Sequence, residues 1–256
     1  MSLGGVVGLP LEVALLFLIG LVSAVINTLA GGGTLLTVPA MVLLGFGPLT
    51  ANATNRAGLV IQSLSATVHY RRRRVLRVRQ ALQLTGIVCV GAGLGAWLAT
   101  RLPERTFGQV MAVLMVAALL FLLLRPARWF ASRPAATSAH PVLAGLGLLG
   151  VGLYGGFFGA GVGIFILLLL AALQGLDLVA GNTVKSVMVL ALSLSASAMF
   201  AALGWIDYRA LLPLAAGNAV GGWVGAHLSL RGGNVWIRRL LLLVVIAGVY
   251  KLLRYP

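Results

Sequence analysis

Acidic residues are scarce in this sequence, which has only four in 256 positions against 19 lysines and arginines. Charged residues of both signs make up 9% of the chain, whereas a soluble domain carries about a quarter. Hydrophobic residues reach 60%, and the mean hydropathy is +1.05. A water-soluble core cannot hide so much apolar surface. The composition therefore predicts a protein whose solvent is the lipid bilayer.

Several chemical motifs are also missing. The single cysteine, Cys89, lies in an apolar segment and cannot form an internal disulfide. The chain has no CxxC pair, HExxH, GxSxG or Walker loop and no paired carboxylates within an apolar segment. We therefore expect no enzyme activity, no metal and no cofactor. The first twelve residues lack lysine and arginine, so the first hydrophobic run is expected to stay in the mature protein.

The apolar runs are continuous, and many reach the roughly 17–25 residues that a membrane-spanning helix needs. Lipid cannot satisfy backbone hydrogen bonds, so such runs are expected to be helical. The basic residues lie mostly in short loops between the runs, as the positive-inside rule requires. The net charge of +15 therefore indicates membrane topology and not nucleic-acid binding. The predicted fold class is an all-α polytopic membrane protein.

Three strings recur in the same order at an offset of 129 to 130 residues, which indicates a duplicated unit. AGGGT at 30–34 matches GAGVG at 159–163, and ANATNR at 51–56 matches AGNTVK at 180–185. GAGLGAWLATR at 91–101 matches GGWVGAHLSLR at 221–231. We expect a first membrane repeat at 1–128, a cytoplasmic linker at 129–141 and a second repeat at 142–256.

Each half has five apolar segments, giving about eight to ten membrane segments in total. The second segment of each half is short and follows glycine-rich sequence, so these two are expected to be half-helices or re-entrant pieces. The ten segments are expected near 10–30, 33–46, 54–69, 81–100, 107–125, 142–158, 162–174, 184–204, 210–230 and 237–254.

The distribution of positive charge favours halves of opposite orientation. With the second half inverted, twelve basic residues lie on the cytoplasmic side, namely Arg71, Arg72, Arg73, Arg74, Arg77, Arg79, Arg125, Arg128, Arg133, Arg231, Arg238 and Arg239. Five lie outside: Arg101, Arg105, Arg209, Lys251 and Arg254. Both termini are then external. Inverted repeats are common in secondary transporters, which bind substrate near the midplane between the halves. A scaffold built by duplication is the alternative.

Glycine-rich strings and polar residues suggest the binding site. Breaks at 31–33 and near 155–163 would expose half-helix N-termini, which attract anions; close helix packing is the other explanation for the glycines. Downstream, Arg56 and Lys185 occupy matching positions within apolar segments. Such residues usually have a function, although each could instead extend to the interface. The candidate anion-binding residues from these patterns are Gly31, Gly32, Gly33, Thr34, Asn52, Thr54, Asn55, Arg56, Gly161, Gly163, Asn182, Thr183 and Lys185.

Residues that could couple transport to an ion gradient are few. The acids Glu12, Glu104, Asp177 and Asp207 all lie near segment ends. His227 lies within an apolar segment and is the candidate proton relay. A packed, hydrogen-bonded histidine is the alternative reading.

The run from Asn27 to Arg56, with AGGG, Val38-Pro39, Gly45 and ANATN, resembles the sulfite exporter TauE/SafE family, also called the toluene sulfonate uptake permease family. GLYGGFFGAGVG at 152–163 and NTVK at 182–185 extend the likeness to the second half. The resemblance implies a multi-pass carrier in a bacterial-type inner membrane for sulfite, sulfonates or thiosulfate. Its candidate site residues are Asn27, Thr54, Asn55 and Arg56, whereas Val184 replaces the asparagine in the second copy.

Two other function classes remain open at this stage. A passive anion channel would not respond to an opposing proton gradient, and a membrane scaffold would bind no anion. The expected partners are a small anion and the bilayer, without nucleic acid; self-association, the coupling ion and the direction of transport are left open.

Overall fold

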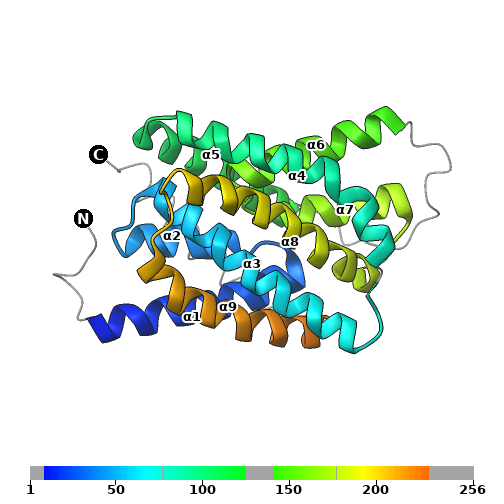
Figure 1. Ribbon diagram of the computed structural model, residues 1–256, viewed down its shortest axis with the longest axis horizontal. Coiled ribbons are helices and arrows are strands. Elements are labelled where there is room, and N and C mark those ends of the chain that lie inside the picture. Colours follow the sequence, from blue (N-terminus) through cyan, green and yellow to red (C-terminus); the bar gives the residue numbers. More distant parts are fainter. Residues whose placement is uncertain (1–8, 77, 125–140, 177, 231–256) are drawn as a thin grey trace.

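The computed structural model describes residues 9–76, 78–124, 141–176 and 178–230. Within these ranges the chain forms nine α-helices and no strand, which confirms the all-α fold class (Figure 1). The nine helices lie close to nine of the predicted segments. The tenth predicted segment, 237–254, and residues 129–140 of the predicted linker fall outside the described residues. The helices are α1 (Leu9–Ala30), α2 (Thr34–Leu43), α3 (Pro48–Arg72), α4 (Val78–Arg101), α5 (Glu104–Leu124), α6 (Pro141–Phe157), α7 (Val162–Gln174), α8 (Leu178–Ala202) and α9 (Tyr208–Ser229).

The first predicted helix break is present between α1 and α2. Gly31 has a φ of +78°, in the left-handed region that glycine occupies without strain. The helix resumes at Thr34, and α2 has only 10 residues. At 1.5 Å per residue this is roughly 15 Å, about half of the hydrocarbon thickness. α2 is therefore a half-helix.

The second half contains a similar break between α6 and α7. Gly159 and Gly161 have φ values of +65° and +71°, and α7 has 13 residues. Its length of roughly 20 Å is also less than the membrane thickness. Both short segments predicted from the sequence are thus interrupted helices.

Small residues allow two helix pairs to pack with their backbones in contact. α1 packs along α9, and α4 packs along α6. A Cβ atom at Gly217 on α9 would overlap the carbonyl of Phe17 on α1, and one at Gly156 on α6 would overlap the carbonyl of Ala92 on α4. Such close approach is the usual role of glycine at membrane helix interfaces.

The packing pairs correspond between the two halves. If α1, α3 and α4 are matched with α6, α8 and α9, the pair α1–α9 becomes α6–α4, and α3–α9 becomes α8–α4. In Figure 1, α1 begins at the left end of the bundle, whereas α6 begins at the right end. This arrangement is what an inverted duplication would produce, and the duplication itself stays a prediction.

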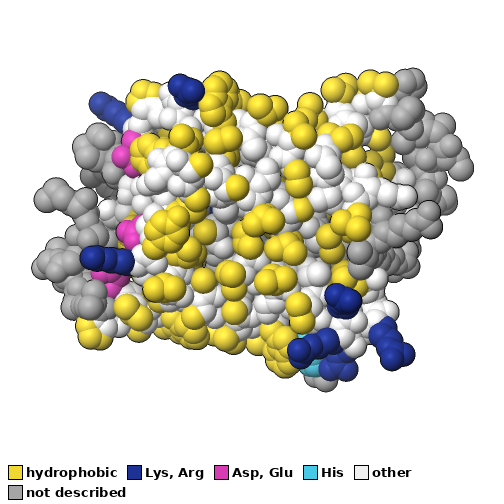
Figure 2. Space-filling model, viewed as in Figure 1, with side chains coloured by type: hydrophobic (Ala, Val, Ile, Leu, Met, Phe, Trp, Pro, Cys, Tyr) yellow, Lys and Arg dark blue, Asp and Glu magenta, His cyan; other side chains and the backbone are white. Residues whose placement is uncertain are grey.

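The charged side chains gather at the two ends of the bundle on the face shown in Figure 2, and hydrophobic side chains spread over the middle. Arg71 and Arg72 lie in the last turn of α3, and Arg73 and Arg74 follow it. Arg101, Glu104 and Arg209 lie at the opposite end, where α4 ends and α5 and α9 begin. Three helical stretches are long and apolar enough to span a bilayer: Pro10–Ala30, Ala81–Arg101 and Val179–Ala202. This distribution matches a protein crossing the membrane along its helix axes.

Candidate functional site

Helix α3 lies in the interior of the bundle and buries a polar face. Its buried polar side chains recur at helical spacing along most of its length: Asn52, Thr54, Asn55, Arg56, Gln62, Ser63, His69 and Tyr70. Charged and amide groups are costly to place against lipid, so they face other helices. α3 packs against α8 and α9. The polar face of α3 therefore lines the middle of the molecule.

The two helix breaks meet at this centre. A Cβ atom at Gly31 would lie 2.6 Å from the backbone carbon of Gly163, and one at Gly163 would lie 2.7 Å from the Gly31 Cα. Backbone atoms that are 132 positions apart in the sequence are thus in direct contact. Only glycine permits this contact, which places the start of α7 beside the end of α1.

Lys185 on α8 binds the C-terminal end of α1. Its Nζ donates to the carbonyl oxygens of Asn27 at 3.2 Å and Thr28 at 2.9 Å. These carbonyls belong to the last turn of α1, where the helix dipole concentrates negative charge. The cation therefore stabilises the end of an interrupted helix from the other half of the chain.

Arg56 on α3 makes the equivalent contact with α6. Its Nη2 donates to the carbonyl oxygen of Phe158, and Asn52 Nδ2 donates to that of Phe157 at 3.0 Å. The guanidinium occupies the space that a Cβ at Gly159 would need. Each matched cation thus holds the broken helix of the opposite half.

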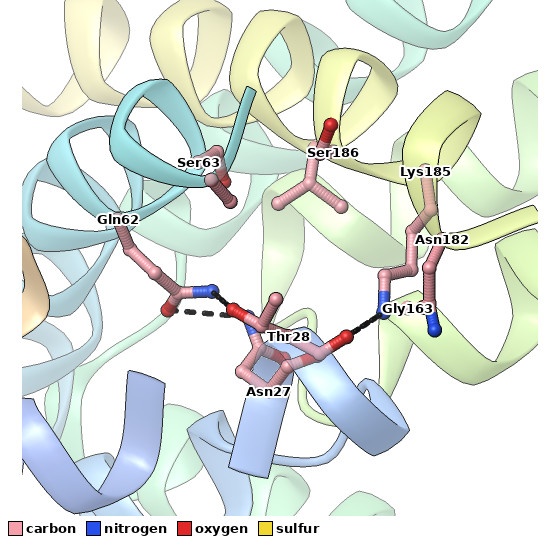
Figure 3. Close-up of a pocket in the computed structure, with 10 residues that line it drawn as sticks. Asn27, Thr28, Gln62, Ser63, Gly163, Asn182, Lys185 and Ser186 are labelled. Atoms are coloured by element: carbon pink, nitrogen blue, oxygen red, sulfur yellow. Dashed lines mark hydrogen bonds between the residues drawn. The ribbon is translucent and has the colours of Figure 1, made fainter. Parts of the chain in front are cut away.

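A small cavity with several polar residues in its lining lies beside Lys185, near the midpoint of α3 (Figure 3). Its volume of about 10 Å³ is enough for about one water molecule. The lining has one positive charge, three amide side chains, three hydroxyls and no acidic side chain. The residues come from α1, α3, α7 and α8: Asn27, Thr28, Gln62, Ser63, Ala66, Gly163, Asn182, Lys185, Ser186 and Val189.

Hydrogen bonds fix one wall of this pocket. Asn27 Nδ2 donates to Gln62 Oε1 at 3.3 Å, and Gln62 Nε2 donates to Thr28 Oγ1 at 3.3 Å (Figure 3). The Gly33 N–H, at the start of α2, donates to Asn27 Oδ1 at 3.3 Å. Opposite, Asn182 is buried with its Oδ1 unpartnered among the described residues. The pocket therefore presents hydrogen-bonding groups beside a cation and the N-terminus of α7.

Comparison with known proteins identifies the family. The family model described as "Sulfite exporter TauE/SafE" matches residues 16–252. The chain belongs to this family.

Relatives agree over nearly the full length of the chain. A protein of Sinorhizobium named "Probable membrane transporter protein ORF9" is 29% identical, and the match covers 95% of this chain and 93% of the relative. A Haemophilus influenzae protein named "Probable membrane transporter protein" is 29% identical, with 90% of each chain covered. Escherichia coli K12 YfcA, named in the same way, is 28% identical over 95% of this chain and 90% of its own. No solved structure matches. These findings support a membrane transporter and not an enzyme.

The pocket contains four of the residues predicted from the sequence or from the family resemblance: Asn27, Gly163, Asn182 and Lys185. Others surround it: Gly31 contacts Gly163, and Thr34 begins α2 and is buried. Gly32 lies in the same break, and Gly161 is the N-cap of α7.

The remaining predicted residues do not line this pocket. Asn52 and Arg56 bind the end of α6, and Thr54 Oγ1 accepts a hydrogen bond from the backbone N–H of Asp207 at 3.0 Å. Asn55 is buried on α3, and Thr183 donates to the carbonyl of Ala180 at 2.7 Å. The structure therefore does not gather Arg56 and Lys185 around one cavity.

Sequence reasoning omitted Thr28, Gln62, Ser63 and Ser186 from the candidate site. Gln62 and Ser63 lie two turns after Asn55 and Arg56 on the same face of α3. Extending the polar pattern by seven residues would have found them.

The candidate proton relay, His227, does not line the pocket. It is half-buried near the end of α9 and stacks on Trp223, with ring centroids 5.9 Å apart. The His69 ring lies 5.8 Å from it.

Proposed function

We propose that this protein is a secondary transporter that moves a small sulfur-containing anion, of the sulfite, sulfonate or thiosulfate class, across a bacterial-type inner membrane. The anion binds in the Lys185 pocket, between helices from both halves of the chain. The proposal rests mainly on one observation: a cation and uncharged polar groups converge where two interrupted helices meet inside a membrane protein. The sulfur chemistry is suggested by the family description, sulfite exporter.

The pocket chemistry suits an oxyanion. The ammonium of Lys185 provides positive charge, and the side chains of Asn182, Gln62 and Ser63 can donate hydrogen bonds to oxygen atoms. Gly163 places the first turn of α7, with its backbone N–H groups and positive dipole end, at the same cavity. These are the features expected of a transporter site at a broken helix.

The cavity must widen before an anion can bind. A sulfur oxyanion is larger than the single water molecule that fits now. Lys185 lies between the cavity and the end of α1, so it can exchange a carbonyl partner for an oxygen of the anion. The narrow pocket therefore corresponds to a closed state of the carrier.

Replacement of Lys185 tests this proposal. The purified protein is titrated with sulfite, thiosulfate, taurine and sulfate while its thermal unfolding is followed. We expect at least one anion to stabilise the wild type. Loss of one charge-assisted hydrogen bond, about 1.5–3 kcal/mol, should weaken binding to Lys185→Gln by roughly tenfold to a hundredfold.

Arg101→Gln is the matched control, because Arg101 is exposed at the end of α4. It should bind the anion like the wild type. Wild-type affinity in Lys185→Gln would refute the assignment of the pocket, and failure of every anion to stabilise the wild type would favour a scaffold. Counterflow in proteoliposomes separates the carrier from a channel, because only a carrier exchanges labelled anion faster when unlabelled anion is present on the other side.

A further inference from the structure

A cluster of aromatic and imidazole rings lies at the end of the bundle where α3 and α9 finish. His69 on α3 is only 4% exposed, and its Nε2 has no hydrogen-bond partner among the described residues. The rings of Trp223 and His227 lie 5.3 Å and 5.8 Å from it, both edge-to-face. A buried imidazole with an unused nitrogen can accept a proton.

This cluster is close to the proposed anion pocket. Ala66 lines the pocket, and His69 follows it by three residues, about 4.5 Å along the helix axis. Thr67 Oγ1 donates to Ser186 Oγ, another pocket residue, at 3.1 Å. His69 therefore lies between the pocket and the arginine-rich end of α3.

The other side chains that could bind a proton are far from the pocket. Glu12, Glu104 and Asp207 lie at the opposite end of the bundle, where α1, α5 and α9 begin. Asp177 and the third histidine, His140, lie outside the described residues. Within the described part of the chain, His69 and His227 are thus the two histidines next to the path.

The charges that face His69 are all positive. Arg72, in the last turn of the same helix, and Arg73, the residue after it, lie close enough to act on it electrostatically, and α9 contributes His227. α8 contains a single charged residue, Lys185, in the pocket. These charges oppose a second proton on the pair of imidazoles, and a nearby anion would offset the repulsion.

We propose that His69 and His227 form a proton-binding site that couples anion transport to proton movement. The pair accepts one proton on an imidazole nitrogen while an anion occupies the neighbouring pocket, and releases it when the anion leaves. Because coupling is reciprocal, a proton on the pair strengthens anion binding by the same factor as the anion strengthens proton binding. This inference rests on the proposed anion carrier, and it goes beyond it by assigning the coupling ion.

Two transport assays on the same proteoliposomes test the coupling. Counterflow of radiolabelled sulfite or thiosulfate at equal pH measures anion exchange alone. Uptake driven by an inward proton gradient, with the membrane potential clamped, measures coupling. In the wild type we expect the gradient to stimulate uptake several-fold. In His69→Gln/His227→Gln we expect this stimulation to be lost and counterflow to remain.

Two further variants keep the test decisive. His227→Gln alone replaces a half-buried side chain and should reduce the stimulation even if the double variant fails to fold. His140→Gln should behave as the wild type, because the sequence places His140 in the linker.

The possible failures are distinguishable. Wild-type counterflow without any response to the gradient would refute the coupling and leave the carrier intact. Full stimulation in His227→Gln and in a folded double variant would also refute it. A parallel loss of counterflow and stimulation in a folded double variant would refute it too, because the histidines would then be part of the anion path. Absence of wild-type counterflow would refute the proposed function and this inference together.

Discussion

Replacement of Arg56 by glutamine separates two roles for the most deeply buried cation in the described structure. Arg56 is fully buried on α3, and its guanidinium donates to the carbonyl of Phe158 at the end of α6. Glutamine is shorter and neutral, so it removes both the contact and the charge. If Arg56 caps the helix, the loss should be one of stability; if Arg56 is an anion ligand, it should be one of affinity.

The expected loss of stability follows from the contact. A hydrogen bond to a charged group contributes about 1.5–3 kcal/mol. The favourable interaction with the helix dipole adds up to about 2 kcal/mol, and relief of the cost of burying a charge offsets a similar amount. For a chain of this size a net loss of about 1.5–3 kcal/mol lowers the Tm by roughly 3–12 °C.

Thermal unfolding in detergent measures this loss, and anion titration below the Tm measures affinity. We expect Arg56→Gln to have a lower Tm and an anion affinity close to that of the wild type. Arg209→Gln, which alters an exposed arginine at the start of α9, should change neither. An unchanged Tm with loss of anion binding would refute the capping role and make Arg56 a ligand.

Two further substitutions and one control variant test the geometry of the centre. Gly163→Ala places a Cβ 2.7 Å from the Gly31 Cα, well inside the usual carbon–carbon separation of about 3.5–4.0 Å, so we expect a lower Tm and little transport. Gly86→Ala, which has open space around the new Cβ, should be neutral or stabilising by up to about 1 kcal/mol, and equal effects of the two substitutions would contradict the contact. Gln62→Leu leaves Thr28 and Asn27 without a side-chain partner, so unfolding should show a loss of about 1–3 kcal/mol and titration should show weaker anion binding; wild-type values in both would exclude a role for this wall of the pocket.

Much of the fold follows from local sequence. The break at Gly31–Gly33 and the short helices that follow each break were predicted, because consecutive glycines lose helix propensity wherever they occur. The helix ends also lie near the predicted segment ends, since apolar length and charge placement are local properties. Asn27, Asn182 and Lys185 were among the predicted site residues, and all three line one pocket.

The partners of the two buried cations could not be read from the sequence. From the sequence, Arg56 and Lys185 were predicted to be anion ligands, because they occupy matching positions within apolar segments. The structure shows another source of negative charge, the carbonyl groups at the ends of α1 and α6. These contacts form only when helices more than 100 residues apart pack together, so no local pattern reveals them. The contact between His69 and His227 was missed for the same reason.

The hydrogen bonds from Lys185 to the end of α1 also affect which substrates the proposed site would select. To admit a larger molecule, Lys185 must give up at least one of its bonds to the carbonyls of Asn27 and Thr28, each worth about 1.5–3 kcal/mol as a charge-assisted contact. A neutral solute gives the ammonium a bond of the same kind as the lost one, also about 1.5–3 kcal/mol, so the exchange gains nothing and leaves a carbonyl without the cation. An anion gives the ammonium a bond between two charged groups, and the Coulomb attraction adds to the hydrogen bond and can offset the lost carbonyl contact. The pocket would therefore open for anions, because only an anion compensates for the carbonyl contact that Lys185 gives up. Selectivity for charge would then depend on the bonds of the closed state as well as on the contacts of the open state.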